Sequence, residues 1–441
     1  MKIVQAACWY YPDTVGGIEV YVAALSKHLR LAGHEVFIAA PHTQHKRERS
    51  YEHEGLPVYR YPIPLKPTRK ESRGIIATHG TGYFHEWLAK LRPDVVHFQD
   101  LNIGLGITEM QFAKSLGVKV VFTSHIGTLG NLCRRGTLMY MGRRVCDGLV
   151  SGGKCAPCLL ELRHVPEALA RITGKIPSSF GRYLSYLPFG IGTALGMNYL
   201  VGADRSAFSR LFSLVDKFVV LTQSGADIVA ANGFDRRKIF VNRLGIAESA
   251  ETKKPSSQET PAKKPVKFGY LGRFEAIKGV YHLAKAAASL PGDVSFTLEF
   301  CGPVITPAEK NCLNKIKSIV RNDPRITFVA AISHAKTFDL LRSCDVLCCP
   351  SVCFEGGPTV ALEAYAVGTP VIGTKIGGLA EIVVDKVNGR LVEPGDLQGL
   401  IRVMKEIAQD PSGTIEVWRK NIPSVRTMAQ VAEDYTTIYK I

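Results

Sequence analysis

Short apolar strands alternate with amphipathic helices along almost the whole chain. In the first half the strand-like runs are "KIVQAACW", "EVFIAAP", "DVVHFQD", "KVVFTSH" and "KFVVLTQ". In the second half they are "KFGYLGR", "SFTLEFCG", "ITFVA", "DVLCCPS" and "TPVIGT". Continuous apolar runs are typical of parallel strands buried on both faces, and strand–helix alternation builds such sheets. The sequence therefore predicts an α/β protein with doubly wound parallel sheets.

One segment interrupts this alternation and divides the chain. Residues 250–266, "AETKKPSSQETPAKKPV", are rich in Lys, Pro and Ser, a composition typical of a solvated linker. At 441 residues the chain is also too long for one ordinary core. We expect a first domain over 1–249, a second over 267–420 and a final helix within 421–441, with a ligand cleft at the carboxyl ends of the strands.

Positive charge is concentrated in the first half. Residues 1–250 carry 31 Lys and Arg against 19 Asp and Glu, a balance of +12, whereas residues 251–441 carry 24 against 20, a balance of +4. This excess indicates an anionic partner such as a phosphorylated lipid, a membrane face or a nucleic acid, although solubility alone would explain it as well.

Cysteine usage and the amino terminus bear on the compartment. The eleven cysteines are odd in number, and several lie in apolar segments such as "SCDVLCCP", which indicates reduced, buried thiols. The start, "MKIVQAA", lacks the charged leader and apolar core of a secretory signal. Both features favour the cytoplasm, where thiols stay reduced.

Residues 183–203 form an uncharged apolar segment whose length is close to that of a membrane span. Pro188 and four glycines interrupt it, however. We expect a helical insertion that is partly buried, or an apolar surface that touches a membrane, with a buried core slightly favoured.

The stretch "FEGGPTVALEAYAVGTPVIGTKIGGLAEIV" places Glu355 and Glu363 on either side of a loop and a helix start. The small residues Gly356 and Gly357 let backbone amides approach a ligand, and a helix beginning near Pro358 offers unpaired N–H groups. Phosphate or sugar oxygens suit such a place. On spacing alone, a solvated Glu355 and a Glu363 favoured by the helix dipole would explain the pattern better.

The longer fragment "FEGGPTVALEAYAVGTPVIGTKIGGLAEIVVDKVNGRLVEPGD" resembles the E-x7-E region of the family 4 retaining glycosyltransferases. The resemblance extends over most of the chain, through "GGIE", "DVVHFQD", "FTSH" and "GYLGRFEAIKGV", in the order of that family. One departure is Gly-Pro where Phe-Gly is more usual. The resemblance implies the GT-B fold, with two Rossmann-like doubly wound domains that face an interdomain cleft.

The resemblance also implies roles for individual residues. Glu355 would bind the hydroxyls of the donor sugar and Glu363 those of the ribose, while Arg273 and Lys278 would neutralise the diphosphate. His125 would contact the sugar near the reacting carbon. Further donor contacts are expected from Gly16, Gly17, Gly272, Gly356, Gly357, Pro358, Thr359 and Val360. Contacts with the acceptor are expected from Glu19, which could instead order its loop, and from His97 and Gln99.

The implied activity is that of a retaining hexosyltransferase in polysaccharide biosynthesis. It would move a sugar from a UDP or GDP donor to a glycan or lipid-linked acceptor by a front-face route without a catalytic metal. The protein would be cytoplasmic, with peripheral membrane contact at the inner face. The alternatives are a sugar-nucleotide epimerase of the same fold and a basic, zinc-stapled nucleic-acid-binding protein. Scattered basic residues and few interleaved aromatics disfavour nucleic acid.

Four cysteines cluster in "CRRGTLMYMGRRVCDGLVSGGKCAPC", which ends in C-x2-C. Cys133, Cys146, Cys155 and Cys158 could bind a structural zinc ion tetrahedrally and hold an insertion of about 130–210 that shapes the acceptor side. Unconnected thiols, a redox pair formed by the last two cysteines, and an iron–sulfur cluster are the alternatives.

Overall fold

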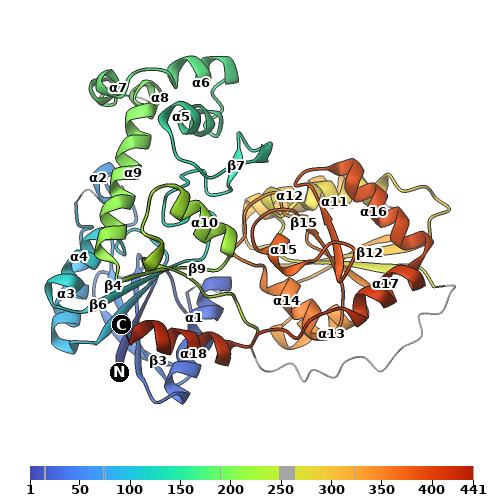
Figure 1. The fold of residues 1–441 in the computed structure, drawn as a ribbon, viewed down its shortest axis with the longest axis horizontal. Coiled ribbons are helices and arrows are strands. Elements are labelled where there is room, and N and C mark those ends of the chain that lie inside the picture. The colour runs from blue at the N-terminus through green and yellow to red at the C-terminus, as the bar shows by residue number, and fades with distance from the viewer. Residues whose placement is uncertain are drawn as a thin grey trace. The chain divides into compact units, whose positions relative to one another are not determined.

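The computed structural model describes residues 1–13, 16–72, 74, 76–188, 190–247, 264–321 and 323–440. The chain forms two compact units, shown in Figure 1. The first comprises Met1–Gly142, Cys146–Arg243 and Met428–Ile441, and the second comprises Arg143–Val145 and Leu244–Thr427. Of the predicted linker 250–266, all but the last three residues lie outside the described residues.

The described part of the first unit contains an eight-stranded sheet in the order β10-β9-β6-β5-β1-β2-β4-β3. Its described strands pair in parallel except for β3, which is antiparallel to β4 at one edge. Strand order reverses between β1 and β5, which is where ligands bind in open sheets of this kind. The strands are β1 (Lys2–Ala7), β2 (Glu35–His42), β3 (Arg49–His53), β4 (Leu56–Pro62), β5 (Val95–Gln99), β6 (Lys119–Ser124), β9 (Lys217–Val220) and β10 (Ile239–Val241).

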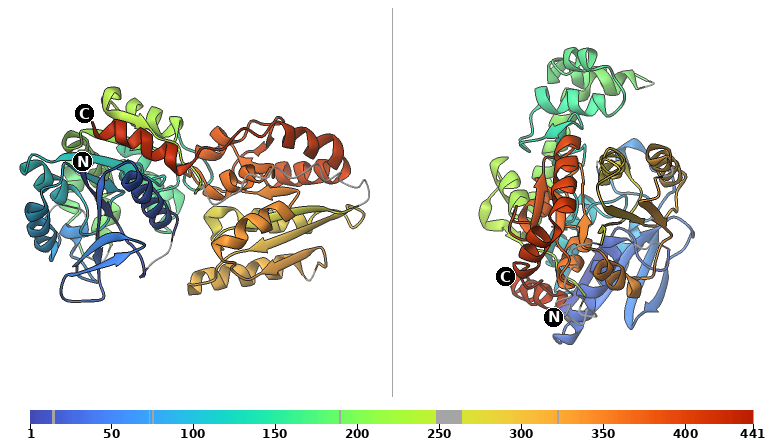
Figure 2. Two further views of the ribbon diagram at one scale, coloured as in Figure 1. Left: turned by 90° about the horizontal axis from the view of Figure 1, so that it is seen from below. Right: turned by 90° about the vertical axis from the view of Figure 1, so that its right-hand side faces the viewer.

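Helices flank this sheet and include one from the end of the chain (Figure 2). The carboxy-terminal helix α18 (Met428–Tyr439) packs beside α1 (Gly17–Leu31) and buries Val431, Tyr435 and Tyr439. The sequence predicts this segment as a helix within 421–441. The other helices of this part are α2 (Arg69–Ser72), α3 (Thr81–Leu91), α4 (Ile107–Ser115), α10 (Gln223–Ala231) and the 3-10 turn η1 (Arg236–Lys238).

An insertion separates β6 from β9. It contains the hairpin β7 (Met139–Tyr140) and β8 (Arg144–Val145), then α5 (Gly152–Glu161), α6 (Glu167–Thr173), α7 (Ser178–Leu184), α8 (Ile191–Leu195) and α9 (Met197–Leu214). The short helices α5–α8 gather at the far end of α9 from the sheet of this unit (Figures 1 and 2). Ala156, Leu160, Ala170, Leu200 and Val201 belong to a small core of their own.

The apolar segment 183–203 is divided between core and surface. Met197, Leu200 and Val201 are buried, whereas Tyr183 and Tyr186 are exposed. The segment is therefore the partly buried helical insertion that the sequence predicts. Among the helices described, none is long and apolar enough to cross a membrane.

The described part of the second unit contains a six-stranded, wholly parallel sheet in the order β13-β12-β11-β14-β15-β16. This is the strand order 3-2-1-4-5-6 of a Rossmann fold, with its reversal between β11 and β14. The strands are β11 (Val266–Leu271), β12 (Phe296–Cys301), β13 (Ile326–Val329), β14 (Val346–Cys348), β15 (Val371–Thr374) and β16 (Gly389–Val392).

Two separate cores show that helices cover both faces of this second sheet. One core joins the strands to α11 (Val280–Ala288), α12 (Pro307–Val320), α16 (Leu397–Gln409) and α17 (Pro411–Lys420). The other joins them to α13 (His334–Ser343), α14 (Thr359–Ala366) and α15 (Gly377–Ile382). The predicted fold class, with doubly wound parallel sheets, is thus confirmed.

Candidate active site

In the second unit, the predicted donor residues gather where the strand order reverses. Gly272 and Arg273 follow β11, and Lys278 ends the 3-10 turn η2 (Ala276–Lys278) just before α11. The neighbouring strand β14 leads into the loop that carries Glu355. Residues 77 positions apart in sequence are thereby brought together by the parallel pairing of β11 with β14.

Glu355 is held by two side chains. The Lys278 ammonium lies 2.8 Å from Oε2 of Glu355, and the Ser351 hydroxyl donates a hydrogen bond to Oε1. Burial alone would lower the pKa of Lys278, but the adjacent Glu355 carboxylate outweighs burial and raises that pKa. Lys278 is therefore a permanent cation at neutral pH. Ser351 was not predicted, although its position four residues before Glu355, in the loop that follows β14 (Val346–Cys348), could have indicated it.

Arg273 is more open than Lys278. Its side chain is 59% exposed and forms an ion pair of 2.9 Å with Glu275, while its carbonyl oxygen accepts a hydrogen bond from Tyr270. An exposed guanidinium fixed at its backbone can turn toward an arriving anion at little cost. The geometry suits the predicted role of Arg273 as a diphosphate ligand, which stays a prediction.

The Glu355 loop is packed backbone to backbone against the start of α15. The amide of Gly378 donates to the carbonyl oxygen of Glu355 at 2.8 Å, and Gly357 has a φ of +129°, which favours glycine. A Cβ atom at Gly378 would lie 2.5 Å from the Cα of Gly357. Gly377 and Gly378 are the first two residues of α15, and the absence of a side chain at Gly378 permits this close contact.

Helix α14 begins at Thr359, with Pro358 as its N-cap and without a side-chain cap. Its first amides, at Thr359 and Val360, thus lie at an uncapped, electropositive helix end, which suits anionic oxygens. Glu363 is half-buried one turn further on. Because Glu363 follows Thr359 by four residues, the two side chains lie on the same face of the helix.

In the first unit, His125 directly follows β6 and lies above a buried hydrogen-bond network. Its Nε2 lies 2.6 Å from Oε1 of Gln99, and the side-chain Nε2 of Gln99 donates a hydrogen bond to Oε1 of Gln5 at 2.7 Å. Since a carbonyl oxygen accepts, Nε2 of His125 carries the proton. Tyr21 packs edge-on against the imidazole at 4.8 Å. The network therefore fixes both the tautomer and the orientation of His125.

Burial decides the charge state of this group. It lowers the pKa of His125 to about 3 and raises the pKa of the neighbouring Asp100 to about 6. The Asp100 carboxylate accepts a hydrogen bond from the backbone amide of His125 at 3.1 Å. At neutral pH His125 is thus a neutral imidazole.

His97 and Gln99 do not reach the surface. Both are 0% exposed, and the two ring nitrogens of His97 lie 2.6 Å from the Tyr439 hydroxyl and 2.7 Å from the Thr123 hydroxyl. Both side chains are thus enclosed in this structure, and their contact with the acceptor stays a prediction. They connect α18 to the support of His125.

Glu19 lies in the first turn of α1 and is 8% exposed. A Cβ atom at Gly16, the N-cap of this helix, would lie 2.8 Å from the Glu19 carboxylate, so this carboxylate lies close to the backbone at the start of the helix. Gly17, by contrast, has open space around it. Of the two predicted roles for Glu19, this packing favours ordering of the loop.

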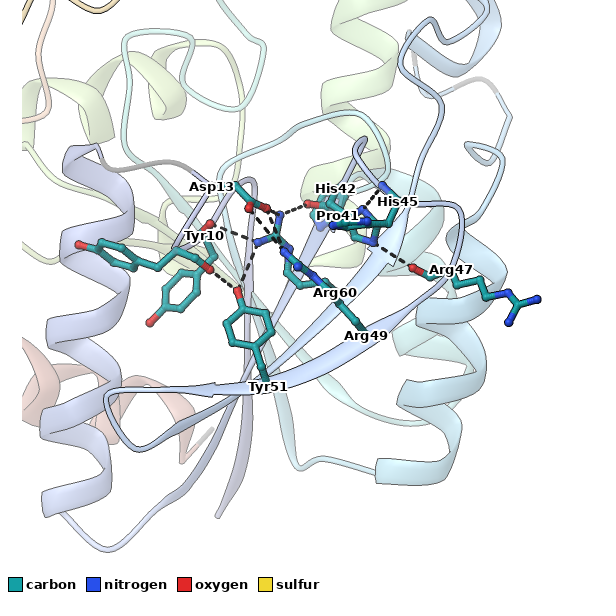
Figure 3. Close-up of polar contacts among 10 residues, drawn as sticks. Tyr10, Asp13, Pro41, His42, His45, Arg47, Arg49, Tyr51 and Arg60 are labelled. Atoms are coloured by element: carbon teal, nitrogen blue, oxygen red, sulfur yellow. Dashed lines mark hydrogen bonds and ion pairs between the residues drawn. The ribbon is translucent and has the colours of Figure 1, made fainter.

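A buried ion pair anchors the segment that leads from β1 toward Gly16 (Figure 3). Arg60 on β4 is fully buried, pairs with Asp13 at 2.8 Å, and donates to the carbonyl oxygens of Tyr10 and Pro41. Arg49 adds a weaker contact with Asp13 at 3.4 Å. None of these residues was predicted. The signal available was an arginine inside the apolar run "PVYRYP".

The four cysteines of the insertion line one cavity together with Lys154. All eleven cysteines lie within the described residues and are free, and burial raises the pKa of Cys146 and of Cys155. In the described part of the chain, His, Cys, Asp and Glu side chains form no group of three or more spaced to hold a metal ion. All four cysteines thus lie around the same cavity. Zinc binding by them stays a prediction.

Comparison with known proteins identifies both parts of the chain. Residues 16–245 match the model of the glycosyl transferase 4-like domain, and residues 251–425 match that of glycosyl transferases group 1. A phosphatidyl-myo-inositol mannosyltransferase of Mycolicibacterium smegmatis is 24% identical over 91% of this chain and 84% of that protein. A D-inositol 3-phosphate glycosyltransferase of the same organism is 29% identical, and the match spans 44% of this chain and 45% of that relative.

Two solved structures share the fold over their full length. Sucrose-phosphate synthase from Thermosynechococcus elongatus has a TM-score of 0.63 at 18% identity, covering 100% of this chain and 98% of that one. HepE from Anabaena, in complex with UDP-glucose, has a TM-score of 0.63 at 14% identity and covers 100% of both chains. These matches do not favour an epimerase or a nucleic-acid-binding protein. The chain therefore belongs to the family 4 glycosyltransferases, and its two units have the Rossmann-like architecture of the GT-B fold.

Proposed function

We propose that this protein transfers a sugar from a UDP or GDP donor to an acceptor, with retention of configuration at the anomeric carbon. The observation that carries the proposal is the arrangement of Lys278, Glu355 and Ser351 beside the uncapped start of α14, at the strand-order reversal of the second unit. Cations and helix amides there suit a diphosphate, and two carboxylates suit the hydroxyls of a sugar and a ribose.

In this proposal the second unit stabilises the leaving group. As the bond between the anomeric carbon and the phosphate oxygen lengthens, negative charge develops on the diphosphate. Lys278, Arg273 and the amides of Thr359 and Val360 offset that charge with groups already in place, which is the usual source of such rate acceleration. Glu355, oriented by Ser351, accepts hydrogen bonds from the sugar hydroxyls.

The charge state of His125 supports a front-face route. An imidazole whose pKa is about 3 is a poor base at neutral pH. In the proposed route the acceptor proton passes to the departing phosphate oxygen, while the acceptor oxygen bonds to the anomeric carbon on the face that the phosphate leaves. In this route His125 contacts and orients the donor sugar, and no catalytic metal is required.

The acceptor belongs to the first unit in this proposal. A cavity of about 220 Å³ lies between α9 and the loops that follow β4, β5 and β6. Its polar lining residues include Asn102 and Asn131, the ion pair of Arg134 with Asp204 at 3.6 Å, and the carboxylates of Glu71 and Glu109. The names of two relatives include a phosphorylated inositol as part of the acceptor. These names and the balance of +12 in residues 1–250, rather than the lining of the cavity, favour a phosphate-bearing or lipid-linked acceptor over a neutral glycan.

Incubation with UDP-sugars and GDP-sugars, with and without phosphorylated polyol and lipid acceptors, tests the proposal. Mass spectrometry should detect a glycosylated acceptor and the released nucleoside diphosphate, and NMR of the product should show the donor's anomeric configuration. An isomerised nucleotide sugar from donor alone would support an epimerase instead. The absence of both transfer and hydrolysis with every donor tested would overturn the proposal.

Calorimetric titration with UDP and with GDP provides a second test that needs no acceptor. The Arg273→Ala variant should bind the preferred nucleotide about tenfold more weakly, because one charge-assisted contact is lost. Arg402→Ala is a matched control, since Arg402 is 67% exposed in the same unit and pairs only loosely with Asp396 at 3.9 Å. If both variants bound the nucleotide equally well, Arg273 would not be a diphosphate ligand.

A further inference from the structure

The helical group α6–α8 carries an unusual apolar surface. Six of its large apolar side chains, which we call the tip patch, are more than half exposed, between 51% and 79%: Leu169, Ile172, Phe180, Tyr183, Tyr186 and Ile191. Single exposed apolar residues need no explanation, but a concentration of this kind marks an interaction site. The patch is separate from the core of the insertion, which is formed by other residues, including Ala170, Met197 and Leu200.

The spacing within the patch follows the helices. Phe180 and Tyr183 are three residues apart on α7, and Leu169 and Ile172 are three residues apart on α6. Residues at this spacing share one face of a helix, so each helix presents an apolar stripe. On the opposite sides, Gly181 of α7 and Ala170 of α6 are buried. Both helices therefore expose their large apolar side chains and bury small residues, the reverse of an ordinary surface helix.

The charged residues of α6–α8 and their connections are mostly basic. Between Glu167 and Asp204 the sequence contains no acidic residue, and its charged residues there are Arg171, Lys175 and Arg182. Lys175 and Arg182 are exposed, whereas Arg171 is paired with Glu167 at 2.7 Å. Along residues 167–203 the one carboxylate, Glu167, is paired with Arg171, so the aromatic side chains are flanked by the two remaining cations. This pattern matches the interface of an anionic bilayer, where rings lie at headgroup depth and cations meet lipid phosphates.

The dimensions agree with binding at the interface rather than insertion across the bilayer. Helices α6 and α7 have seven residues each and α8 has five, and none of the helices described could span a membrane. Helix α9 places this group away from the sheet of the first unit (Figure 1). The tip patch can therefore enter the headgroup region while the sheet stays in water.

We propose that the tip patch docks this protein on an anionic lipid surface, with the stripe of α7 inserted and with Lys175 and Arg182 on the headgroups. This inference does not depend on the proposed transferase reaction. It would apply equally to a chain with another activity, because it rests on the exposure, spacing and charge of residues 168–203.

Co-sedimentation of the full chain with lipid vesicles tests the inference. Vesicles of phosphatidylcholine should bind weakly, and vesicles containing phosphatidylglycerol should bind strongly and in a salt-sensitive manner. The variant Phe180→Ser/Tyr183→Ser/Tyr186→Ser should bind the anionic vesicles at least about tenfold more weakly, because its apolar contact is removed. Lys175→Glu/Arg182→Glu should lose at least as much, since each cation near such a surface strengthens binding about fivefold.

A matched control comes from the same unit. Leu31 and Leu65 are 74% and 76% exposed but lie outside α6–α8, so Leu31→Ser/Leu65→Ser removes comparable apolar surface elsewhere. This control should bind vesicles as the unchanged protein does. Equal binding by the control and the serine variant of the tip patch, or absence of binding to anionic vesicles, would overturn the inference. So would self-association in sedimentation velocity that the tip-patch substitutions abolish, because a second copy would then cover the patch.

Discussion

The contact between Gly378 and the Glu355 loop allows a sharp prediction for Gly378→Ala. The new Cβ atom would lie 2.5 Å from the Cα and 2.6 Å from the nitrogen of Gly357, and 3.0 Å from the carbonyl carbon of Gly356. Since carbon atoms prefer separations of about 3.5–4.0 Å, the loop has to move by about 1 Å. The atoms in conflict are all backbone, so no side-chain rotation can relieve the clash.

A displacement of this size has two measurable consequences. Overpacking of a tight contact costs about 1–3 kcal/mol of unfolding free energy, which a urea titration would show. A misplacement of about 1 Å at a reacting group costs about 100-fold in rate. We therefore expect kcat/KM for the preferred donor to fall about 100-fold at a temperature where circular dichroism shows the variant to be folded.

The control for this experiment is Gly292→Ala in the same unit, because a Cβ atom at Gly292 meets nothing within 4 Å. It should leave both stability and turnover close to those of the unchanged protein. If Gly378→Ala retained full kcat/KM while folded, the backing of the Glu355 loop by α15 would be irrelevant to catalysis, and the reasoning would be refuted.

Four further outcomes follow from the geometry. Glu355→Gln removes the carboxylate that raises the pKa of Lys278, so the alkaline limb of the pH–rate profile should move to lower pH; an unmoved limb would dissociate Lys278 from the reaction. His125 has a pKa of about 3 in the folded protein against an ordinary value of 6.5, so it lowers the free energy of unfolding as pH falls from 6.5 toward 3. His125→Asn should flatten that part of an acid-unfolding curve, and an unchanged curve would contradict this expectation. Arg60→Met leaves the Asp13 carboxylate without its buried partner and should cost about 3–5 kcal/mol in urea unfolding, whereas Arg49→Met should cost about 1 kcal/mol or less; similar values for both would contradict the burial argument. If the insertion binds zinc, metal analysis of the purified chain should find about one equivalent that disappears when the C-x2-C pair is changed to serine, and a metal-free chain unaffected by chelators would refute zinc binding.

The parallel strands could be predicted because each is a continuous apolar run between turns. The exceptions show what the pattern misses. The hairpin of β3 and β4 was not predicted, because β3 is polar at the edge of the sheet and β4 contains the buried Arg60. A charged residue in a strand is expected to be exposed unless a partner for its charge is known. The partner of Arg60 is Asp13, which is far away in sequence.

The site was predictable to different degrees in the two units. The Lys278–Glu355 pair joins residues 77 positions apart, and the family resemblance, rather than their spacing, indicated both. The family resemblance implied contact of His97 and Gln99 with the acceptor, whereas both side chains are buried in the structure. They are buried because of contacts with α18, including one across 342 positions between His97 and Tyr439, which no local pattern could have shown.

The docking of α18 has a consequence for how the chain is made. The side chains of Tyr435 and Tyr439 complete the hydrogen-bond network of the first unit, yet the ribosome translates them only after the whole second unit. During synthesis the polar groups of Gln5, His97 and Thr123 have to wait for these partners. Maturation of the first Rossmann-like unit thus coincides with delivery of the last helix, so nascent chains that stall early carry an incompletely assembled amino-terminal half.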